Sequence, residues 1–393
     1  MTLQKLSPNR AAAVSAIPEW LALLACARAS ADASSLAEAL GEALEWPRLL
    51  ALADQHGLLP LVGARLRAAD IDPPVAVCRQ LQDAQRSQII FTLSLTAELF
   101  RVLERFASLG IEILLTKGPA LAARCYGDPG SRQYSDLDFV ARNADMRRAT
   151  ETMMALGYES KVPIKSIEAG KFPGEYVFVR SDTKLMIEFH TEKTFRYHPR
   201  PIAVENLFLR CASVRFDGRE VPVLSVEDEL MLISIHAAKH FWTRLMWVAD
   251  VAALISEQNV DWNRAISAAR EVSAERMLRI ALLLAVNVLG ARVPVKIKSF
   301  LRSDSAAIRI AARIARRLPL GESAAFGIFE RAAFRVRMRG GLLQGPAYLL
   351  RLSLSPTEED WVAGAEERRS WIVDAAARPF RLARKYGRNE RPR

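Results

Sequence analysis

Two aspartates that stand two residues apart, Asp136 and Asp138, are the side chains in this sequence best placed to do chemistry. Side chains of a strand alternate between its two faces, so both carboxylates would share one face while Leu137 and Phe139 point into a core. Neighbouring carboxylates repel each other and need a cation. The pattern predicts a site for Mg²⁺ or Mn²⁺, which bind carboxylates together with water and substrate phosphates.

A third acid, Glu188, interrupts the apolar run at residues 184–190. A buried carboxylate is costly unless it is paired or bound to metal. If this strand lies beside the Asp-x-Asp strand, Glu188 completes a set of three carboxylates for two divalent ions. His190 shares the face of Glu188 and would orient a ligand or act as a base.

The segment before the aspartates predicts a strand followed by a helix. Residues 111–116 form a compact apolar run that ends before Gly118. Pro119 favours a helix start, with residues 119–126 as the helix and its free N–H groups facing a phosphate. Lys117 adds a positive charge at the same end.

Together, Lys117-Gly118, Arg132, Asp136-Leu-Asp138 and Glu188-Phe-His190 resemble a bacterial family of uncharacterised nucleotidyltransferases. That family lies within the superfamily that has the DNA polymerase β-like fold. The superfamily places a glycine turn at a helix start, then an Asp-x-Asp strand, then a third acid on a neighbouring strand. Here lysine replaces the usual serine near the glycine. Residues 236–250 are also similar to the downstream helical signature of the family.

The resemblance implies transfer of a nucleotidyl group from a nucleoside triphosphate, such as ATP, to an acceptor. The implied ligands of Mg²⁺ or Mn²⁺ are Asp136, Asp138 and Glu188. Lys117 and Gly118 would hold the phosphates, and Arg132 would either pair with Asp136 or clamp a phosphate. The acceptor stays open among a small molecule, a sugar phosphate, a peptide, a protein and RNA.

Two histidines, His236 and His240, lie four residues apart and would share one helix face. A zinc site would need a third ligand, and no His-Glu-x-x-His pattern is present. We therefore expect neutral histidines that bond Asp250 or face the nucleotide cleft. The nearby Trp242 and Trp247 would stack on a base or lie in the core.

Composition indicates a protein of two or three packed units, because the chain has 393 residues and half of them are hydrophobic. The four cysteines have no paired spacing, which argues against a disulfide framework and a zinc finger. No apolar run is long enough for a membrane span, and no signal peptide is evident. These features predict a soluble, cytoplasmic protein.

Patterning predicts an α+β fold: a polymerase β-like core with a mixed sheet, flanked by helical regions. The expected divisions are residues 1–109, an N-terminal helical region; 110–224, the nucleotidyltransferase core; and 225–393, a basic helical region. Expected N-terminal helices cover residues 17–29, 34–44, 46–56 and 59–69, and a long helical stretch ends near residue 109. Further strands are expected at residues 158–162, 175–180 and 184–190.

The net charge of +11, much of it in the last region, predicts an anionic partner such as nucleic acid, anionic lipid or a phosphorylated substrate. Solvated helix faces would give the same pattern. Two other functions stay open. One is a glycosyltransferase that uses a nucleotide sugar through the Asp-x-Asp motif, and the other is an inactive scaffold that binds nucleic acid.

Overall fold

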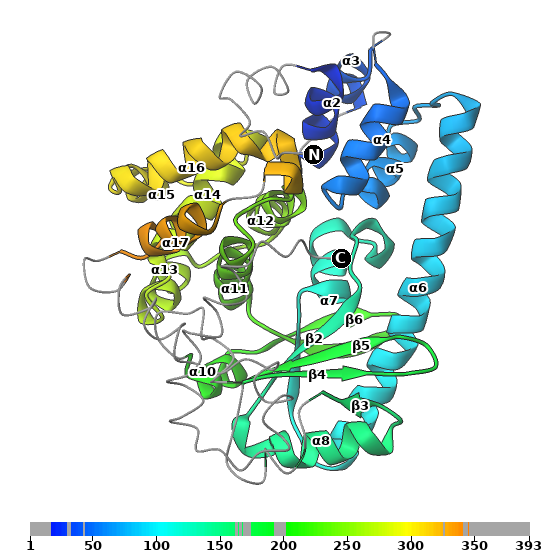
Figure 1. Cartoon of the computed structure of the whole chain (residues 1–393), viewed down its shortest axis with the longest axis vertical. Coiled ribbons are helices and arrows are strands. Elements are labelled where there is room, and N and C mark those ends of the chain that lie inside the picture. Colours follow the sequence, from blue (N-terminus) through cyan, green and yellow to red (C-terminus); the bar gives the residue numbers. More distant parts are fainter. Residues whose placement is uncertain are drawn as a thin grey trace.

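A mixed sheet forms the centre of the structure, which is a computed structural model (Figure 1). The structure describes residues 17–29, 33–41, 44–161, 164, 167, 174–191, 202–324, 327–340 and 345. Most of the lysine-containing segment at residues 161–174 and all of the arginine-rich stretch at 378–385 fall outside these ranges.

Within the described residues the sheet has seven strands in the order β3-β4-β5-β2-β1-β7-β6. The strands are β1 (Ile113–Thr116), β2 (Asp136–Ala141), β3 (Glu159–Ser160), β4 (Glu175–Val179), β5 (Met186–His190), β6 (Ala212–Phe216) and β7 (Arg219–Val223). β2 pairs with β5, and β1 with β7, in parallel; the other pairs are antiparallel. This mixed sheet with many helices confirms the α+β fold class.

One face of the sheet is wholly apolar where β2 and β5 meet. Phe139 and Phe189 stack with ring centroids 5.4 Å apart, and Phe106 from helix α6 (Val75–Ser108) stacks on Phe189 at the same distance. Helix α8 (Met146–Ala155) contributes Met146 and Met153 to this core. Because side chains alternate along a strand, the acids of β2 and β5 face the opposite side.

Helices on the other side of the sheet form a second core, which joins residues from all three predicted regions. The N-terminal helices are α2 (Pro18–Ala27), α3 (Ala33–Ala39), α4 (Trp46–Gln55) and α5 (Leu59–Ala68), close to the predicted ranges. In Figure 1 they lie at the top, and α6 runs along one side of the molecule. The division into three regions stays a prediction.

Helices of the last region pack beside the sheet and above it (Figure 1). They are α11 (Val226–Lys239), α12 (Leu245–Glu257), α13 (Trp262–Glu271), α14 (Glu275–Leu289), α15 (Val295–Arg302), α16 (Ser305–Arg317) and α17 (Ile328–Arg337); α10 (Val204–Leu209) precedes them. In the described part of the chain, no helix combines the length and apolarity that crossing a membrane requires.

The β6–β7 hairpin was not among the predicted strands. Asp217 and Gly218 connect the two strands with φ angles of 46° and 76°. A two-residue Asp-Gly loop between alternating runs is a strong hairpin signal, since both residues tolerate positive φ. The sequence therefore contained the information for this edge of the sheet.

Candidate active site

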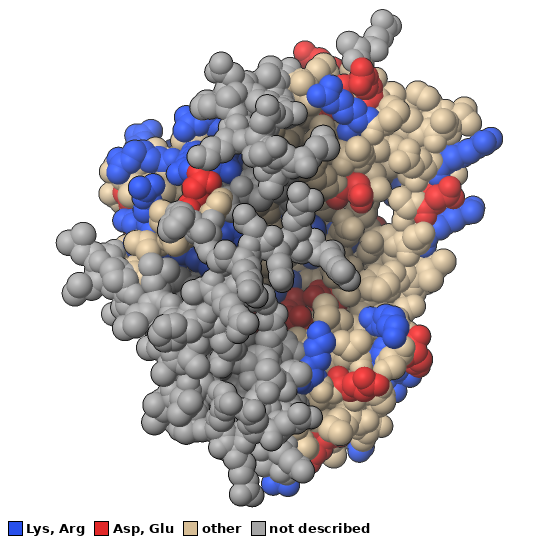
Figure 2. Space-filling model, in the orientation of Figure 1, with Lys and Arg blue, Asp and Glu red and all other residues tan. Residues whose placement is uncertain are grey.

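The register between β2 and β5 brings the predicted acids together. Asp138 is directly opposite Glu188 in this parallel pair, and Val140 is opposite His190. Asp136, Asp138, Glu188 and His190 therefore lie on one face, toward the helices α7 (Gly118–Tyr126) and α11. In Figure 2, acidic side chains are recessed near the middle of the molecular face shown.

Lys117 lies at the edge of this acidic face. Its Nζ is 3.0 Å from Asp138 Oδ2, in an ion pair that is largely shielded from solvent. The backbone at Lys117 has φ 54° and ψ −142°, and Gly118 follows with φ 44°. Few L-residues adopt the first conformation, and glycine suits the second. The sharp turn is what directs the lysine toward the aspartate.

Glu229 on α11 holds this turn from the other side. Its carboxylate accepts the Lys117 backbone N–H at 2.9 Å and the Thr116 hydroxyl at 3.0 Å, and the residue is only 3% exposed. Leu121 N–H donates to the Lys117 carbonyl at 3.0 Å and fixes the next turn. Sequence reasoning missed Glu229 because it lies 112 residues from Lys117, in a helix start that carries three successive acids.

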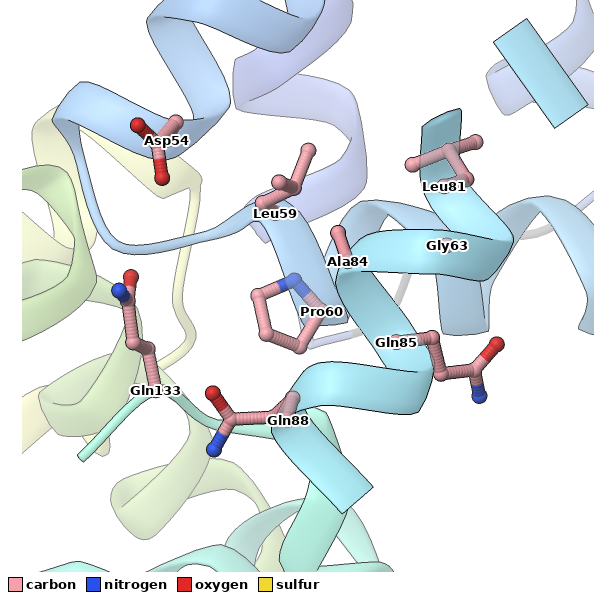
Figure 3. Close-up of a pocket in the computed structure, with 9 residues that line it drawn as sticks. All are labelled: Asp54, Leu59, Pro60, Gly63, Leu81, Ala84, Gln85, Gln88 and Gln133. Carbon is pink, nitrogen blue, oxygen red and sulfur yellow. The ribbon is translucent and has the colours of Figure 1, made fainter. Parts of the chain in front are cut away.

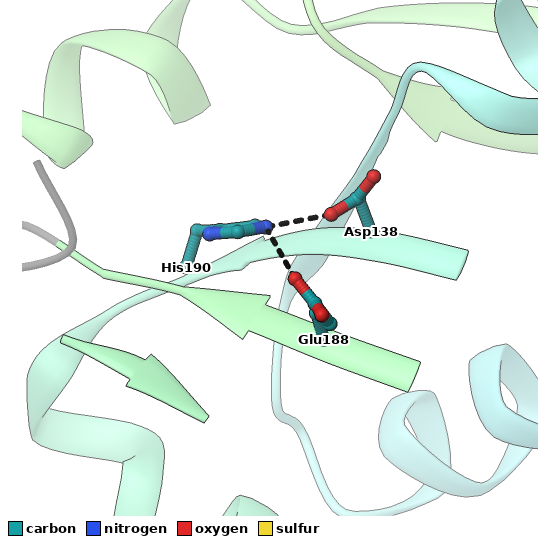
Figure 4. Close-up of side chains that lie close together, drawn as sticks. All are labelled: Asp138, Glu188 and His190. Atoms are coloured by element: carbon teal, nitrogen blue, oxygen red, sulfur yellow. Dashed lines mark hydrogen bonds and ion pairs between the residues drawn. The ribbon is translucent and has the colours of Figure 1, made fainter. Parts of the chain in front are cut away.

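His190 points its Nε2 atom into the gap between Asp138 and Glu188 (Figure 4). Nε2 lies 2.7 Å from Asp138 Oδ1 and 3.8 Å from Glu188 Oε2. One ligand atom from each of these three residues fits within a mutual separation of 4.8 Å. Two carboxylates and an imidazole are donors that a divalent ion accepts, so the residues present fit the metal that the sequence predicted.

The acids differ in their affinity for protons. Burial and the charge of Asp138 raise the pKa of Asp136 to about 6 and that of Glu188 to about 7. Burial opposes ionisation of Asp138 as well, but Lys117 and His190 hold its pKa well below the usual range. Asp138 is thus the permanent anion of the group, and the other two acids gain from any added cation.

Arg132 does not form the ion pair with Asp136 that the sequence suggested. Its guanidinium binds the Asp250 carboxylate on α12, with Nε 3.0 Å from Oδ1 and Nη2 2.9 Å from Oδ2. The Tyr126 hydroxyl also donates to Asp250 Oδ1, at 3.0 Å. Because Asp250 is fully buried, this cluster ties the loop before β2 to α12. A phosphate contact by Arg132 stays a prediction.

The two histidines of α11 form a ring cluster with Trp247 of α12. The centroids of His236 and His240 are 4.7 Å apart, and those of His240 and Trp247 are 5.4 Å apart. Asp250, their expected partner, instead binds Arg132 and Tyr126. Burial and nearby Lys117 lower the pKa of His236 well below its usual range, so its ring is neutral at pH 7. Among the described residues, the group suited to a metal contains neither histidine.

A separate cleft lies between α5, α6 and the loop before β2 (Figure 3). Gln133 from that loop lies opposite Pro60 and Gln88, and Gln133 Oε1 has no hydrogen-bond partner in the described part of the chain. Asp54 is the one charged residue among the described residues that line the cleft. A site without cations is poorly suited to phosphates.

Comparison with known proteins adds the family. Residues 42–290 match the model of the uncharacterised nucleotidyltransferase family. The curated proteins gave no match. A solved structure, an antigenic nucleotidyltransferase-like protein from Paracoccidioides brasiliensis, is 14% identical over 53% of this chain and 94% of that chain, with a TM-score of 0.34. Since the family match spans more than half of the sequence, this chain belongs to the uncharacterised nucleotidyltransferase family.

Proposed function

We propose that the protein moves a nucleotidyl group from a nucleoside triphosphate, such as ATP, to an acceptor, on a core of the polymerase β-like type. The observation that carries this proposal is the register of β2 with β5, which sets Asp138 opposite Glu188 beside the ammonium group of Lys117. Three acids next to a lysine and a helix start are the parts needed to bind a polyphosphate through a divalent ion.

In this proposal Asp136, Asp138 and Glu188 hold Mg²⁺ or Mn²⁺. A bound ion would neutralise charge on the phosphates and lower the pKa of an acceptor hydroxyl. The acceptor oxygen bonds to the α-phosphorus as the bond to the leaving pyrophosphate breaks. The protein contributes mainly by positioning its groups before the reaction, as in other phosphoryl-transfer sites.

Lys117 and the start of α7 hold the phosphates. The Lys117 N–H is already bonded to Glu229, so the Gly118 N–H and the Lys117 ammonium are the groups we assign to this contact. The ammonium keeps its proton because the ion pair with Asp138 outweighs the effect of burial and raises the pKa of Lys117. A positive charge therefore persists here at neutral pH.

The ring cluster of His236, His240 and Trp247 supports a binding place for the base. His240 is exposed, and Lys239 next to it lies 3.5 Å from Glu175, which is opposite His190 in the sheet. The cluster therefore borders the acidic face. Neutral aromatic rings at such a border stack with any of the bases.

Isothermal titration of nucleoside triphosphates and nucleotide sugars, with and without Mg²⁺ or Mn²⁺, tests the proposal. We expect ion-dependent triphosphate binding that Glu188→Gln weakens and that Glu220→Gln, a change at an exposed strand glutamate, leaves intact. A labelled nucleotide then identifies the acceptor. Binding of nucleotide sugars alone would indicate glycosyl transfer. Ion-independent binding of RNA, kept when Asp136 and Asp138 are both changed to Ala, would indicate an inactive scaffold.

A further inference from the structure

We propose that His190 is a direct ligand of the divalent ion, through Nε2, and that it makes the site prefer a transition-metal ion such as Mn²⁺ over Mg²⁺. This inference rests on the proposed function for the use of the ion, but the ion site itself is built from groups described above. The ligands of this ion from the chain are Asp138, Glu188 and His190, and Asp136 lies beside them on the same face of the sheet.

Geometry supports a shared ion. Two atoms bound at right angles to one octahedral ion, with bonds of about 2.1 Å, lie about 3.0 Å apart. Nε2 is 2.7 Å from Asp138 Oδ1 and 3.8 Å from Glu188 Oε2, so the separations fall on either side of that value. Small rotations about the side-chain bonds bring all three atoms to one ion. Asp138 Oδ2 is paired with Lys117, which leaves Oδ1 as the oxygen for the ion.

The backbone fixes these donors in place. His190 and Glu188 are two residues apart on β5, and β5 pairs with β2 over five successive residue pairs. Phe189, between the two donors, is fully buried and stacks on Phe139 and Phe106. The strand therefore cannot turn His190 away without opening the apolar core on its other face.

The donor set favours a transition metal. Mg²⁺ is bound almost entirely through oxygen and keeps several waters, whereas imidazole nitrogen suits first-row transition ions. A site built only of carboxylates suits both Mg²⁺ and Mn²⁺. An imidazole in the place of one carboxylate shifts the preference toward Mn²⁺, which also accepts carboxylate oxygen.

A different role for His190 would use the same 2.7 Å contact. If Nε2–H only donates a hydrogen bond to Asp138, the histidine orients the carboxylate and the ion is bound by oxygen alone. The substitution His190→Gln separates the role of metal ligand from that of hydrogen-bond donor. The glutamine amide can still donate a hydrogen bond, but it lacks the imidazole nitrogen that would bind the ion.

The test is pulsed electron paramagnetic resonance on the full-length protein loaded with Mn²⁺, without nucleotide, together with titrations of Mn²⁺ and Mg²⁺. We expect a nitrogen coupling from a bound imidazole and an affinity for Mn²⁺ at least about tenfold above that for Mg²⁺. His190→Gln should abolish the coupling and lower the ratio of affinities. The control variant Glu220→Gln, at an exposed residue outside the three-donor group, should keep both.

Each other outcome is decisive. Mn²⁺ binding without nitrogen coupling, or a ratio unchanged in a folded His190→Gln variant, overturns the proposal in favour of the orienting hydrogen bond. Failure of the wild-type protein to bind either ion overturns it as well. A nitrogen-coupled ion in a protein that binds no triphosphate would sustain this inference and reject the proposed function. Triphosphate binding with an ion held only by oxygen would support the proposed function and reject this inference.

Discussion

Lys117 is the residue at which backbone conformation and charge are most closely linked. Its φ of 54° with ψ of −142° is a conformation that costs an L-residue about 1–3 kcal/mol. Two hydrogen bonds to the buried Glu229 carboxylate, one from Lys117 N–H and one from Thr116, keep it there. Glu229 is therefore a positioning residue, which acts on the proposed phosphate contact through the backbone of Lys117.

Replacing Glu229 by Ala should weaken triphosphate binding by about tenfold, or about 1.4 kcal/mol, because the ammonium loses its fixed position. Glu227 supplies the matched control: it lies on the same helix, is also buried, and accepts the Asp261 N–H at 2.9 Å. Glu227→Ala should reduce thermal stability similarly without affecting binding. Glu229→Gln, which keeps an acceptor for the Lys117 N–H, should restore most of the affinity in titrations.

Removing Asp250 should cost far more stability than breaking an exposed ion pair. Asp250→Ala leaves the buried Arg132 guanidinium unpaired, and breaking such a pair costs about 3–5 kcal/mol. Arg270→Ala, which breaks an exposed pair with Glu275, should cost less than about 1 kcal/mol. Urea unfolding of both variants measures the difference. Equal losses would mean that the Arg132–Asp250 pair is not holding α12 in place.

At the scale of elements, His56 joins the end of α4 to the start of α12. Its Nδ1 accepts the Leu245 N–H at 3.1 Å, and its backbone carbonyl accepts the Met246 N–H at 3.2 Å. The residue is fully buried, and burial together with the nearby Arg244 lowers the pKa of His56 to about 4. A neutral imidazole is thus part of this helix junction.

This junction predicts a pH dependence of stability. The unfolded chain protonates His56 near pH 6.5 and the folded chain only near pH 4, so the unfolded state binds more protons between those values. Acidification from pH 7 to pH 4 should therefore remove about 3 kcal/mol through this residue. Urea unfolding across that range checks this. His56→Gln, which offers an acceptor without titrating, should lose about 3 kcal/mol less than the wild type over the same pH range.

Sequence reasoning succeeded for local patterns and failed for distant partners. The alternation around Asp136 and Glu188 was enough to expect two acid-bearing strands on one face, because strand period is a local property. The predicted ion pair between Arg132 and Asp136 was wrong, and the role of Glu229 was missed. Each of the contacts observed instead joins residues more than a hundred positions apart. Nothing in the three acids at the start of α11 indicates which partner each one will meet.

On the scale of the whole molecule, the first turn of α11 is a junction. Glu229 bonds the β1–α7 turn, Asp228 pairs with Arg210 at 2.8 Å, and Glu227 accepts the Asp261 N–H before α13. Ser225 caps the helix and accepts the Asp228 N–H. Three buried acids thus connect the sheet, the segment after α10 and the helical region.

Cutting the chain at this junction should show that the predicted core is incomplete by itself. A fragment of residues 1–224 lacks Glu229, which binds the Lys117 backbone, and Asp250, which pairs with Arg132. We therefore expect it to unfold without a cooperative transition in urea and to bind no triphosphate. The full chain is the control. A cooperative fragment that binds nucleotide would show that residues 1–224 fold and bind without the last helical region.

Basic side chains gather over the helices α15, α16 and α17 on the face shown in Figure 2. Part of this charge serves helix packing, because Arg313 and Arg317 both lie beside Glu330, and Arg276 Nε donates to Asp304 Oδ2 at 2.7 Å. The remaining exposed cations on α15 and α16 should bind RNA weakly, with an affinity that falls as salt rises. Filter binding at two salt concentrations measures this slope.

The contact between Glu229 and the Lys117 turn also constrains how the protein is made. The lysine leaves the ribosome 112 residues before the glutamate that fixes its backbone, and Arg132 precedes Asp250 by 118 residues. During that interval of synthesis the nascent chain contains the acid-bearing strands but lacks α11 and α12, whose Glu229 and Asp250 bind Lys117 and Arg132. Under the proposed function, nucleotide binding should begin only once α11 and α12 have emerged. Premature release of the chain should then yield an inactive product rather than a partly active one.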